Sequence, residues 1–204
     1  MIEKFDVIVI GAGAAGMMCA IEAGKRGRKV LLLDHAKKIG EKIRISGGGR
    51  CNFTNIHTHP SKFISNNPKF VISALKQYTQ NDFIDLIKKH SIKFHEKKLG
   101  QLFCDESSQQ IIDMLLLECE TANVVLKKET VIEDVDKLED KYFITIGPGK
   151  YFCDSLIIAT GGLSIPKIGA SKFGYDIAQK FNLDIVETLP ALVPLTFSEK
   201  ILAM

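Results

Sequence analysis

The sequence predicts an α/β fold built on a parallel β-sheet, and three observations indicate it. Residues 7–10 (VIVI) and 30–33 (VLLL) are short apolar runs of the kind that parallel strands buried on both faces require. Residues 14–23 between them are good helix formers. A further apolar run at 155–160 (SLIIAT) returns late in the chain. Because strand, helix and strand follow one another, we expect βαβ units with helices flanking the sheet.

The first predicted strand ends at a G-x-G-x-x-G motif formed by Gly11, Gly13 and Gly16. In a dinucleotide-binding unit the first glycine makes the tight turn, the second lets the backbone approach a pyrophosphate, and the third lets helix and strand pack closely. A helix that begins at Ala14 and Ala15 would direct its unpaired N–H groups and its positive dipole end at the phosphates. We therefore expect dinucleotide binding, and the alternative is that the glycines serve only tight packing.

Asp34 closes the second predicted strand, roughly 20 residues after the glycines, where a carboxylate accepts hydrogen bonds from a ribose diol. A carboxylate at this place disfavours a 2′-phosphate. The adenosine is therefore expected to belong to FAD or NAD rather than to NADP. His35, which follows directly, is included among the predicted cofactor-binding residues.

The composition is that of an ordinary globular protein. With 204 residues, 46% of them hydrophobic and 25% charged, the chain is long enough for one well-buried domain. The formal net charge of +3 is too mild to indicate nucleic-acid binding, and lysine pairs at 88–89, 97–98 and 127–128 are spread along the chain. We therefore expect a small-molecule substrate and no nucleic-acid partner. Nothing in the sequence indicates the oligomeric state.

No apolar run reaches the length of a transmembrane helix, and residues 1–6 (MIEKFD) carry both signs of charge, unlike a signal peptide. The five cysteines are widely spaced and include no C-x-x-C, which favours a reduced, cytoplasmic protein. Cys51, His57 and His59 lack a fourth ligand at a useful spacing. We expect neither a metal site nor a membrane partner.

A second glycine-rich stretch begins at Ser46. The consecutive backbone N–H groups of Ser46, Gly47, Gly48 and Gly49 can curl into an anion-binding nest. Arg50 adds a planar fork that suits a phosphate or a flavin carbonyl. The alternative is a flexible, solvated loop. Cys51, beside these glycines and the arginine, invites a redox role, but packing near the cofactor is the stronger expectation because no resolving cysteine is nearby.

The middle of the chain is expected to be helical. Residues 70–78 and 81–89 place apolar side chains at three and four spacing, and predict a helical pair that covers the sheet, the second helix capped by Asn81 or Asp82. Residues 100–105 are expected to be extended. Residues 108–121 predict a helix packed on the sheet, and residues 124–126 a third buried strand.

The later part predicts an antiparallel meander followed by a return to the parallel sheet. Residues 130–135, 142–146 and 151–153 are short alternating runs joined by turn residues. The apolar strand at 155–160 then ends at Thr160, Gly161 and Gly162, where small residues let a cofactor lie against the backbone. An ordinary strand-ending turn is the alternative. Residues 169–181 are expected to form a loop and a helix.

Residues 40–55 (GEKIRISGGGRCNFTN), which include Lys42 and Asn52, resemble the E-K-x-R-x-S-G-x-G-R-C-N-x-T-N segment of the BaiN-like flavoproteins. These are bacterial NAD(P)/FAD-dependent oxidoreductases, also called aminoacetone oxidase-like. Further matches are VIVIGAGAAG, LIIATGGLSIPKIGASKFGYDIAQKF and LPALVPL, in family order from about Val7 to Leu195. Some family members have T-G-D where this chain has residues 171–173 (SKF), so a role of that aspartate does not transfer.

The resemblance implies a Rossmann-like FAD-binding fold in which a small antiparallel sheet crosses over the parallel one. It implies FAD as cofactor and NAD(P)H as co-substrate. It also implies that the backbone of Val131 meets the adenine. For an FAD-dependent oxidoreductase we further expect Arg50 to lie close to the cofactor, with Ser46, Gly47 and Asn52 lending hydrogen bonds. No general acid or base is identified.

The same resemblance indicates an incomplete protein. Residues 1–195 are expected to form the amino-terminal part of the FAD-binding domain, and residues 196–204 to begin the exit to an inserted substrate domain. The chain is thus expected to hold the ADP half of the cofactor and to lack most of the isoalloxazine half. The expected function is flavin-mediated hydride transfer between NAD(P)H and an unidentified small organic substrate. The alternatives are a truncated, inactive nucleotide-binding remnant, and an NAD-only dehydrogenase domain, which fails to explain the segment around Arg50.

Overall fold

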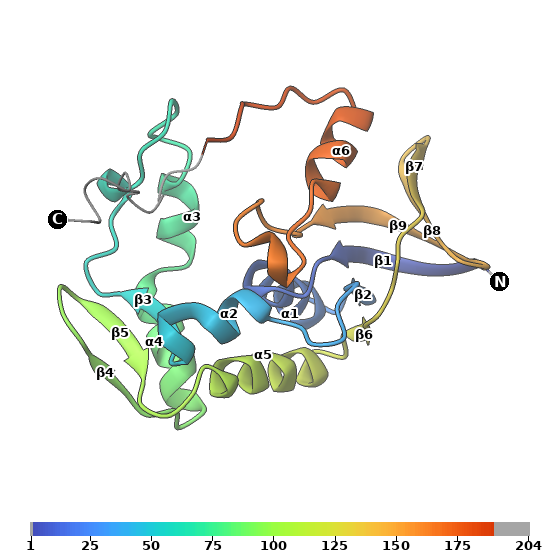
Figure 1. Ribbon diagram of the computed structural model, residues 1–204. Coiled ribbons are helices and arrows are strands. Elements are labelled where there is room, and N and C mark those ends of the chain that lie inside the picture. Colours follow the sequence, from blue (N-terminus) through green and yellow to red (C-terminus); the bar gives the residue numbers. More distant parts are fainter. Residues whose placement is uncertain (1, 190–204) are drawn as a thin grey trace, which may run out of the picture. The chain divides into compact units, whose positions relative to one another are not determined.

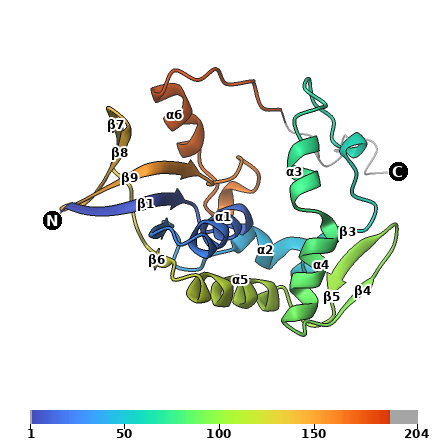
Figure 2. The same ribbon diagram turned by 180° about the vertical axis from the view of Figure 1, so that it is seen from behind.

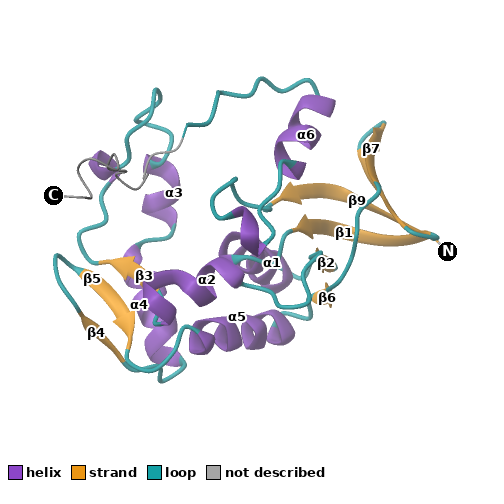
Figure 3. Ribbon diagram, viewed as in Figure 1, coloured by secondary structure: helices purple, strands orange, loops and turns teal. Residues whose placement is uncertain are grey.

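The computed structural model describes residues 2–189 (Figure 1). The chain forms two compact units, Met1–Gly174 and Tyr175–Met204, and each is described by itself. The first unit is an α/β structure, as predicted, and Figure 3 shows its strands and helices in separate colours. Helix α6 (Phe173–Lys180) begins at the end of the first unit and continues in the second, within the predicted loop-and-helix segment. The other main elements are β1 (Ile2–Ile10), α1 (Ala14–Lys25), β2 (Val30–Leu33), α2 (Glu41–Ile45), β3 (Asn52–Asn55), α3 (Ile72–Gln77), α4 (Gln80–Lys89), β4 (Phe94–Glu96), β5 (Gln101–Cys104), α5 (Gln109–Thr121), β6 (Val125–Lys127), β7 (Asp134–Leu138), β8 (Lys141–Ile146) and β9 (Gly149–Ile158).

The larger sheet has six strands in the order β6-β2-β1-β9-β8-β7. Strand β1 lies at its centre and runs parallel to both neighbours, with Val7 opposite Val30 of β2 and Ser155 of β9. Strand β6 is parallel to β2. The parallel sheet predicted from the apolar runs is confirmed, and the bounds of β2 are those predicted, while β1 extends further toward the amino terminus.

Strand β6 differs from the prediction in its burial. It lies at the edge of the sheet, with a neighbour on one side only, and Val125 is 41% exposed. The apolar character of residues 124–126 had predicted a buried strand. An edge strand can keep such side chains half-exposed because single exposed apolar residues are normal at a protein surface.

The antiparallel strands extend the main sheet and do not form a separate crossing sheet. Strand β9 is continuous through the two runs predicted as separate strands, and its first half pairs with β8 and β1 at once. Cys153, fully buried, lies between Tyr142 on one side and Phe5 on the other. The predicted meander of β7, β8 and β9 is present, but it shares a strand with the parallel part.

Helices α1 and α5 pack against each other, and their apolar faces join the sheet in one buried cluster. Met17 and Ile21 of α1 and Ile111 and Leu115 of α5 are each no more than 2% exposed. Burying four such side chains stabilises the fold by roughly 1.5–3 kcal/mol apiece. The helix predicted over residues 108–121 is therefore confirmed in both place and role.

Glu118 connects α5 to two other helices. Its carboxylate is 3% exposed and pairs with Lys25 of α1 at 2.7 Å, with Lys89 at 2.7 Å, and with His90, just after α4, at 2.8 Å. Hydrogen bonds from Lys25 and Lys89 lower the pKa of the Glu118 carboxyl from 4.5 to about 2. Removing this buried charge would leave its three partners uncompensated.

A second, three-stranded antiparallel sheet has the order β3-β5-β4 and was not predicted as a sheet; only residues 100–105, which contain β5, were expected to be extended. Helix α4 packs against β3 and contributes Ile87 to the buried cluster that includes the parallel strands, whereas α3 has no buried residue, so α3 does not have the covering role predicted for it. The predicted cap is also corrected. Thr79 caps α4 through a capping box, in which Asp82 accepts from the Thr79 N–H at 2.6 Å and Thr79 Oγ1 accepts from the Asp82 N–H at 3.3 Å.

The calls on residues 190–195 and 196–204 lie outside the described residues, so the domain boundary at 195 stays a prediction. Within residues 2–189, no helix combines the length and the apolar character needed to cross a membrane.

Candidate dinucleotide-binding site

The glycine motif lies at the junction between β1 and α1. Gly11 has φ +106°, and a Cβ there would lie 2.5 Å from the Ala159 carbonyl oxygen of the neighbouring chain segment. A Cβ on Gly16 would lie 1.7 Å from the Gly11 carbonyl oxygen. Gly13, by contrast, has nothing within 4 Å of the Cβ position and φ −82°. The fold itself therefore requires the first and third glycines, while the space at the second is left open.

Helix α1 begins with no side-chain cap and no acidic residue in its first turn. Gly13 is the N-cap, and its carbonyl accepts the Met17 N–H at 3.0 Å. The first N–H groups of a helix have no partner within it, and the helix dipole favours negative charge in front of them. Ala14 and Ala15 present this end of the helix without bulky side chains, which suits an anionic group such as a pyrophosphate.

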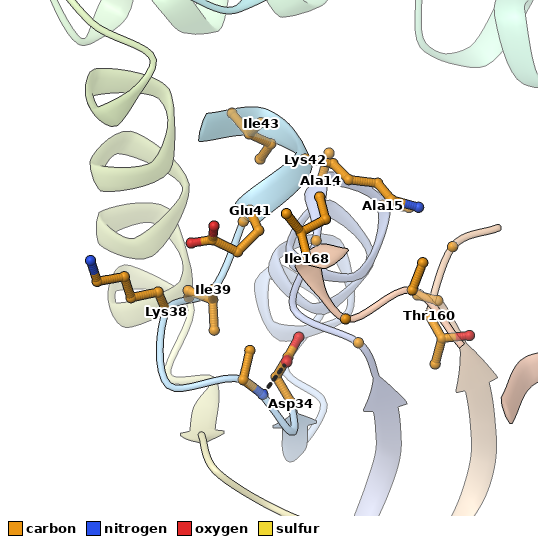
Figure 4. A pocket seen from close by; sticks show the side chains of 18 of the residues that line it. Ala14, Ala15, Asp34, Lys38, Ile39, Glu41, Lys42, Ile43, Thr160 and Ile168 are labelled. Atoms are coloured by element: carbon orange, nitrogen blue, oxygen red, sulfur yellow. Dashed lines mark hydrogen bonds between the residues drawn. The ribbon is translucent and has the colours of Figure 1, made fainter. Parts of the chain in front are cut away.

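Asp34 ends β2, and both of its carboxylate oxygens are engaged. One oxygen accepts from the Ala12 N–H at 2.6 Å, and the other accepts from the Ala36 N–H at 2.8 Å. Figure 4 shows the Asp34 side chain held beside the end of its strand. The side chain is 12% exposed, and His35 Nδ1 lies 3.6 Å from it. Each oxygen retains a second lone pair, so the carboxylate is fixed in place and still able to accept from a ribose hydroxyl.

A cavity of about 600 Å³ lies at the carboxyl ends of β1, β2 and β9. Ligands in open α/β folds bind at this edge of the sheet. Figure 4 shows Ala14 and Ala15 at the start of α1, with Asp34 and Thr160 at the ends of two strands below them. The predicted residues that line the cavity are Gly11, Gly13, Ala14, Ala15, Asp34, His35, Lys42, Ser46, Cys51, Asn52, Val131, Thr160 and Gly161.

A family model described as "HI0933-like protein Rossmann domain" matches residues 5–193. The chain belongs to the HI0933-like Rossmann-domain family. The family is part of the FAD-dependent oxidoreductase superfamily.

Two curated relatives of this HI0933-like chain are similar over nearly its whole length. It is 52% identical over 200 residues to a ribosomal RNA dihydrouridine synthase of Escherichia coli K12, covering 98% of this chain and 50% of the relative. It is 30% identical over 191 residues to a 3-dehydro-bile acid delta(4,6)-reductase of Clostridium scindens, covering 92% of this chain and 46% of that one. The chain spans about half the length of the curated relatives it matches.

Solved structures support the fold. The halogenase PltM, in complex with phloroglucinol and FAD, superimposes with a TM-score of 0.51 at 18% identity, over 91% of this chain and 38% of PltM. At that identity the likeness establishes the α/β fold of the HI0933-like chain and nothing about its chemistry.

Lys42 connects α2 of the HI0933-like chain to the segment that follows β9. Its Nζ donates to the Gly162 carbonyl at 2.9 Å and lies 3.4 Å from the Cβ position of Gly161. Gly162 itself does not line the cavity. The Lys42 ammonium therefore lies at the cavity wall beside the segment that follows β9. Asp34 follows β2, on the other side of β1. At this position the ammonium can pair with an anionic group.

The glycine turn at 46–49 is placed differently from the anion nest that was predicted. Gly47 and Gly48 both have positive φ, and a Cβ on Gly47 would lie 2.7 Å from the Asn52 nitrogen and from the Phe103 ring. The turn closes through the Cys51 N–H, which donates to the Ser46 carbonyl at 3.0 Å. Gly47 and Gly48 lie outside the cavity lining. Gly47 is needed for close packing of the turn, whereas Gly48 has nothing within 4 Å of its Cβ position and only its positive φ favours glycine.

Arg50 is exposed and does not line the cavity, and Gly16 is also outside the lining because it packs against Gly11. What Arg50 contributes to the fold is its carbonyl, which accepts the Cys104 N–H at 3.0 Å. The Arg50 side chain is therefore not part of the cavity lining, in contrast to the expectation that it lies close to a cofactor.

Cys51 lines the cavity and is 6% exposed. Burial raises the pKa of the Cys51 thiol, and a hydrogen bond with Ser46 offsets this only in part. A reactive thiol needs a lowered pKa. The geometry therefore favours packing near the cofactor over a redox role.

Several cavity residues were missed by the sequence analysis because they come from distant segments. Ile39 and Ile43 of the α2 region show a helical four-residue spacing that could have marked them. Phe53 and Phe83, whose ring centroids are 6.1 Å apart, have no local signal. The other unpredicted lining residues include Met18, Lys38, Gly40, Glu41, Ile111, Leu115, Thr130, Ile132, Ala159, Ile168, Gly169, Ala170, Ser171 and Phe173.

Proposed function

We propose that this chain is the FAD-binding half of a reductase that adds hydrogen across a carbon–carbon double bond, and that its substrate is a uridine in ribosomal RNA. The observation that best supports FAD as the cofactor is the open space at Gly13 beside the fixed carboxylate of Asp34. A pyrophosphate fits over Gly13 at the start of α1, and a ribose fits against Asp34.

The other cavity residues fit the same cofactor. Gly11 and Gly16 hold the turn against β9 and so fix the place of the α1 amino terminus. Lys42 stands at the wall beside Gly161, where a cation would pair with a phosphate or with an anionic ring. Val131 lines the cavity and is 70% exposed, which suits the proposed contact with the adenine.

The names of two relatives support the proposed reaction. When bound, FAD would supply hydride transfer from NAD(P)H to the C5–C6 double bond of uridine, with the second hydrogen coming from solvent as a proton. The 52% identity to a ribosomal RNA dihydrouridine synthase supports this substrate. We propose this RNA substrate in place of the small molecule expected from the sequence, and the expected cytoplasmic location is kept as part of the proposal.

A second candidate is reduction of a conjugated double bond in a small organic molecule. The relative named as a 3-dehydro-bile acid reductase supports it at 30% identity, and this reading keeps the BaiN-like assignment. Both candidates need the same cofactor site and differ only in the substrate.

The test has two steps. The purified chain is mixed with FAD, freed of unbound flavin by gel filtration, and mixed anaerobically with NADPH or NADH. We expect a flavin spectrum near unit stoichiometry that bleaches on addition of the nicotinamide. A protein that retains flavin without bleaching would support the nucleotide-binding remnant, and a folded protein that retains none would refute the proposal.

The substrate is tested next. An unmodified ribosomal RNA transcript is incubated with the protein, FAD and NADPH, and its nucleosides are analysed by mass spectrometry. A uridine that becomes two hydrogens heavier supports the RNA substrate. Bleaching that is accelerated by an enone such as a 3-oxo-4-ene steroid, with no change in the RNA, would favour the second candidate.

A further inference from the structure

The charges of this chain are segregated along its sequence, although the net charge is small. Residues 42–81 contain six basic residues and no aspartate or glutamate. Residues 129–140, in contrast, contain six acidic residues and one lysine. A charge asymmetry of this kind indicates an interaction with a polyanion more strongly than the net charge of +3 does. The basic residues are Lys42, Arg44, Arg50, Lys62, Lys69 and Lys76.

Three aromatic side chains are exposed within the basic segment. Phe70 is 78% exposed, Phe63 is 44% exposed and Tyr78 is 39% exposed. Every residue from 61 to 70 is exposed. Exposed apolar patches rimmed by polar residues mark interaction sites, whereas single exposed apolar residues need no explanation. Here the three aromatic side chains alternate with lysines, in the order Lys62, Phe63, Lys69, Phe70, Lys76 and Tyr78.

Three lysines of the basic segment have no partner in the part of the fold that the structure describes. Within the described residues, Lys62, Lys69 and Lys76 form no ion pair and no hydrogen bond through their side chains. Exposed lysines without protein partners carry counterions, which a phosphate backbone can displace on binding.

The part of the basic segment from residue 56 to residue 78 is connected to the cavity wall at both ends. It follows β3, whose Phe53 lines the cavity, and it leads into α4, whose Phe83 also lines the cavity. Figure 2 shows α3 continuing into α4 beside β3. The two rings are 6.1 Å apart, so the segment leaves the cavity wall and returns to it.

The turn between β4 and β5 adds to the same surface. The Ile56 N–H donates to the Gly100 carbonyl at 2.9 Å, and the Asn55 side chain donates to the Leu99 carbonyl at 3.0 Å. Lys97 and Lys98, both exposed, precede this contact directly. We call residues 56–78 together with residues 97–100 the basic–aromatic surface.

We propose that the basic–aromatic surface binds single-stranded RNA and holds it beside the cofactor cavity. This inference rests on the proposed RNA substrate. Proteins bind single strands by stacking bases on aromatic side chains while basic side chains follow the phosphates. A protein partner is the less fitting occupant, since lysine is depleted in the cores of protein interfaces.

The test compares two triple variants in the full chain. Lys62→Gln, Lys69→Gln and Lys76→Gln remove charge from the basic–aromatic surface. Lys128→Gln, Lys137→Gln and Lys150→Gln remove the same charge from exposed lysines elsewhere. Binding of a fluorescein-labelled, unstructured RNA 20-mer is measured by fluorescence anisotropy over a range of KCl concentrations.

We expect the first triple variant to bind at least about tenfold more weakly at ~0.1 M salt, and its log–log salt slope to be shallower by about 2. The control triple should keep most of the affinity. Phe70→Ala should weaken binding roughly tenfold with an unchanged salt slope, because it removes stacking and not charge. Circular dichroism and FAD titration of each variant verify that the fold is intact.

Wild-type RNA affinity in the first triple variant would overturn the proposal, and a protein would then be the more fitting partner of this surface. Loss of RNA affinity in both to the same degree would also overturn it, because binding would then follow net charge alone. FAD binding and its bleaching are measured separately. A failure of the proposed reductase function would therefore appear in the flavin experiment and not in this one.

Discussion

The Asp34 carboxylate accepts a hydrogen bond of 2.6 Å from the backbone N–H of Ala12, although the two residues are 22 positions apart. This bond ties the end of β2 to the turn between β1 and α1. The two parts that a dinucleotide would contact, the phosphate turn and the ribose carboxylate, are therefore held as one unit before any ligand arrives. Such preorganisation lowers the cost of binding.

Replacing Asp34 should weaken FAD binding and loosen the turn. Asp34→Ala removes both acceptors, whereas Asp34→Asn keeps one carbonyl oxygen. A hydrogen bond to a charged group contributes about 1.5–3 kcal/mol. We expect FAD affinity, measured by quenching of flavin fluorescence, to fall at least about tenfold in Asp34→Ala and less in Asp34→Asn. Unchanged affinity in both variants would show that the carboxylate does not contact the cofactor.

Gly16 is required by packing and not by a ligand. A Cβ at this position would lie 1.7 Å from the Gly11 carbonyl oxygen, so the helix or the turn must shift. We predict that Gly16→Ala lowers the free energy of unfolding by about 3 kcal/mol, as measured in urea. Gly13→Ala is the matched control, since nothing lies within 4 Å of its Cβ position. Equal stability of the two variants would contradict this assignment.

Glu118 predicts an acid-sensitive step in stability. Its pKa falls from 4.5 when unfolded to about 2 when folded, so the carboxylate stabilises the native state fully above about pH 4.5. That contribution, about 2–3 kcal/mol, is lost as the pH falls toward 2. Urea unfolding of the wild type should show this loss, and Glu118→Gln should be less stable at neutral pH with a flatter acid profile.

The exposed Glu120 on the same helix provides the control for Glu118. Glu120→Gln should keep the wild-type stability and its pH dependence, because surface charges contribute little. If Glu120→Gln and Glu118→Gln gave the same acid profile, the step could not be assigned to the buried carboxylate.

The cysteines should be slow to react in the folded protein. Burial raises the pKa of Cys104, Cys119 and Cys153 to about 11, and raises that of Cys51 as well. We expect iodoacetamide at mildly alkaline pH to label Cys51 slowly in the native chain and rapidly in urea, as read by mass spectrometry. Preferential labelling of Cys51 in the native chain would instead support a redox role for this thiol.

The residues of the site that could be predicted from the sequence are those whose positions are set by local chain geometry. Gly11, Gly13 and Asp34 have roles set by their distance along the chain from one strand, one helix and the next strand, so spacing alone placed them. Phe53 and Phe83 reach the cavity from a second sheet and its helix, and no local pattern reports such a meeting.

Two predictions differ from the structure for the same reason, because each feature depends on contacts between segments that are distant in the sequence. The continuity of β9 depends on pairing with β8 and β1 at once, which short alternating runs do not reveal. The position of Arg50 depends on the Cys104 N–H bond and the turn before it, and a glycine-rich sequence leaves that direction open. The spread of lysine pairs along the chain did not indicate the basic–aromatic surface, whereas the absence of acidic residues from 42 to 81 does.

The most direct test of the account is a titration of FAD into the wild-type chain and into Gly13→Ala. The Cβ added at Gly13 has free space in the protein but would stand where the pyrophosphate approaches the backbone. We predict saturable binding of one FAD by the wild type, and at least about tenfold weaker binding by Gly13→Ala at unchanged thermal stability. Equal FAD affinity of the two proteins, or no saturable binding by a folded wild type, would contradict the account.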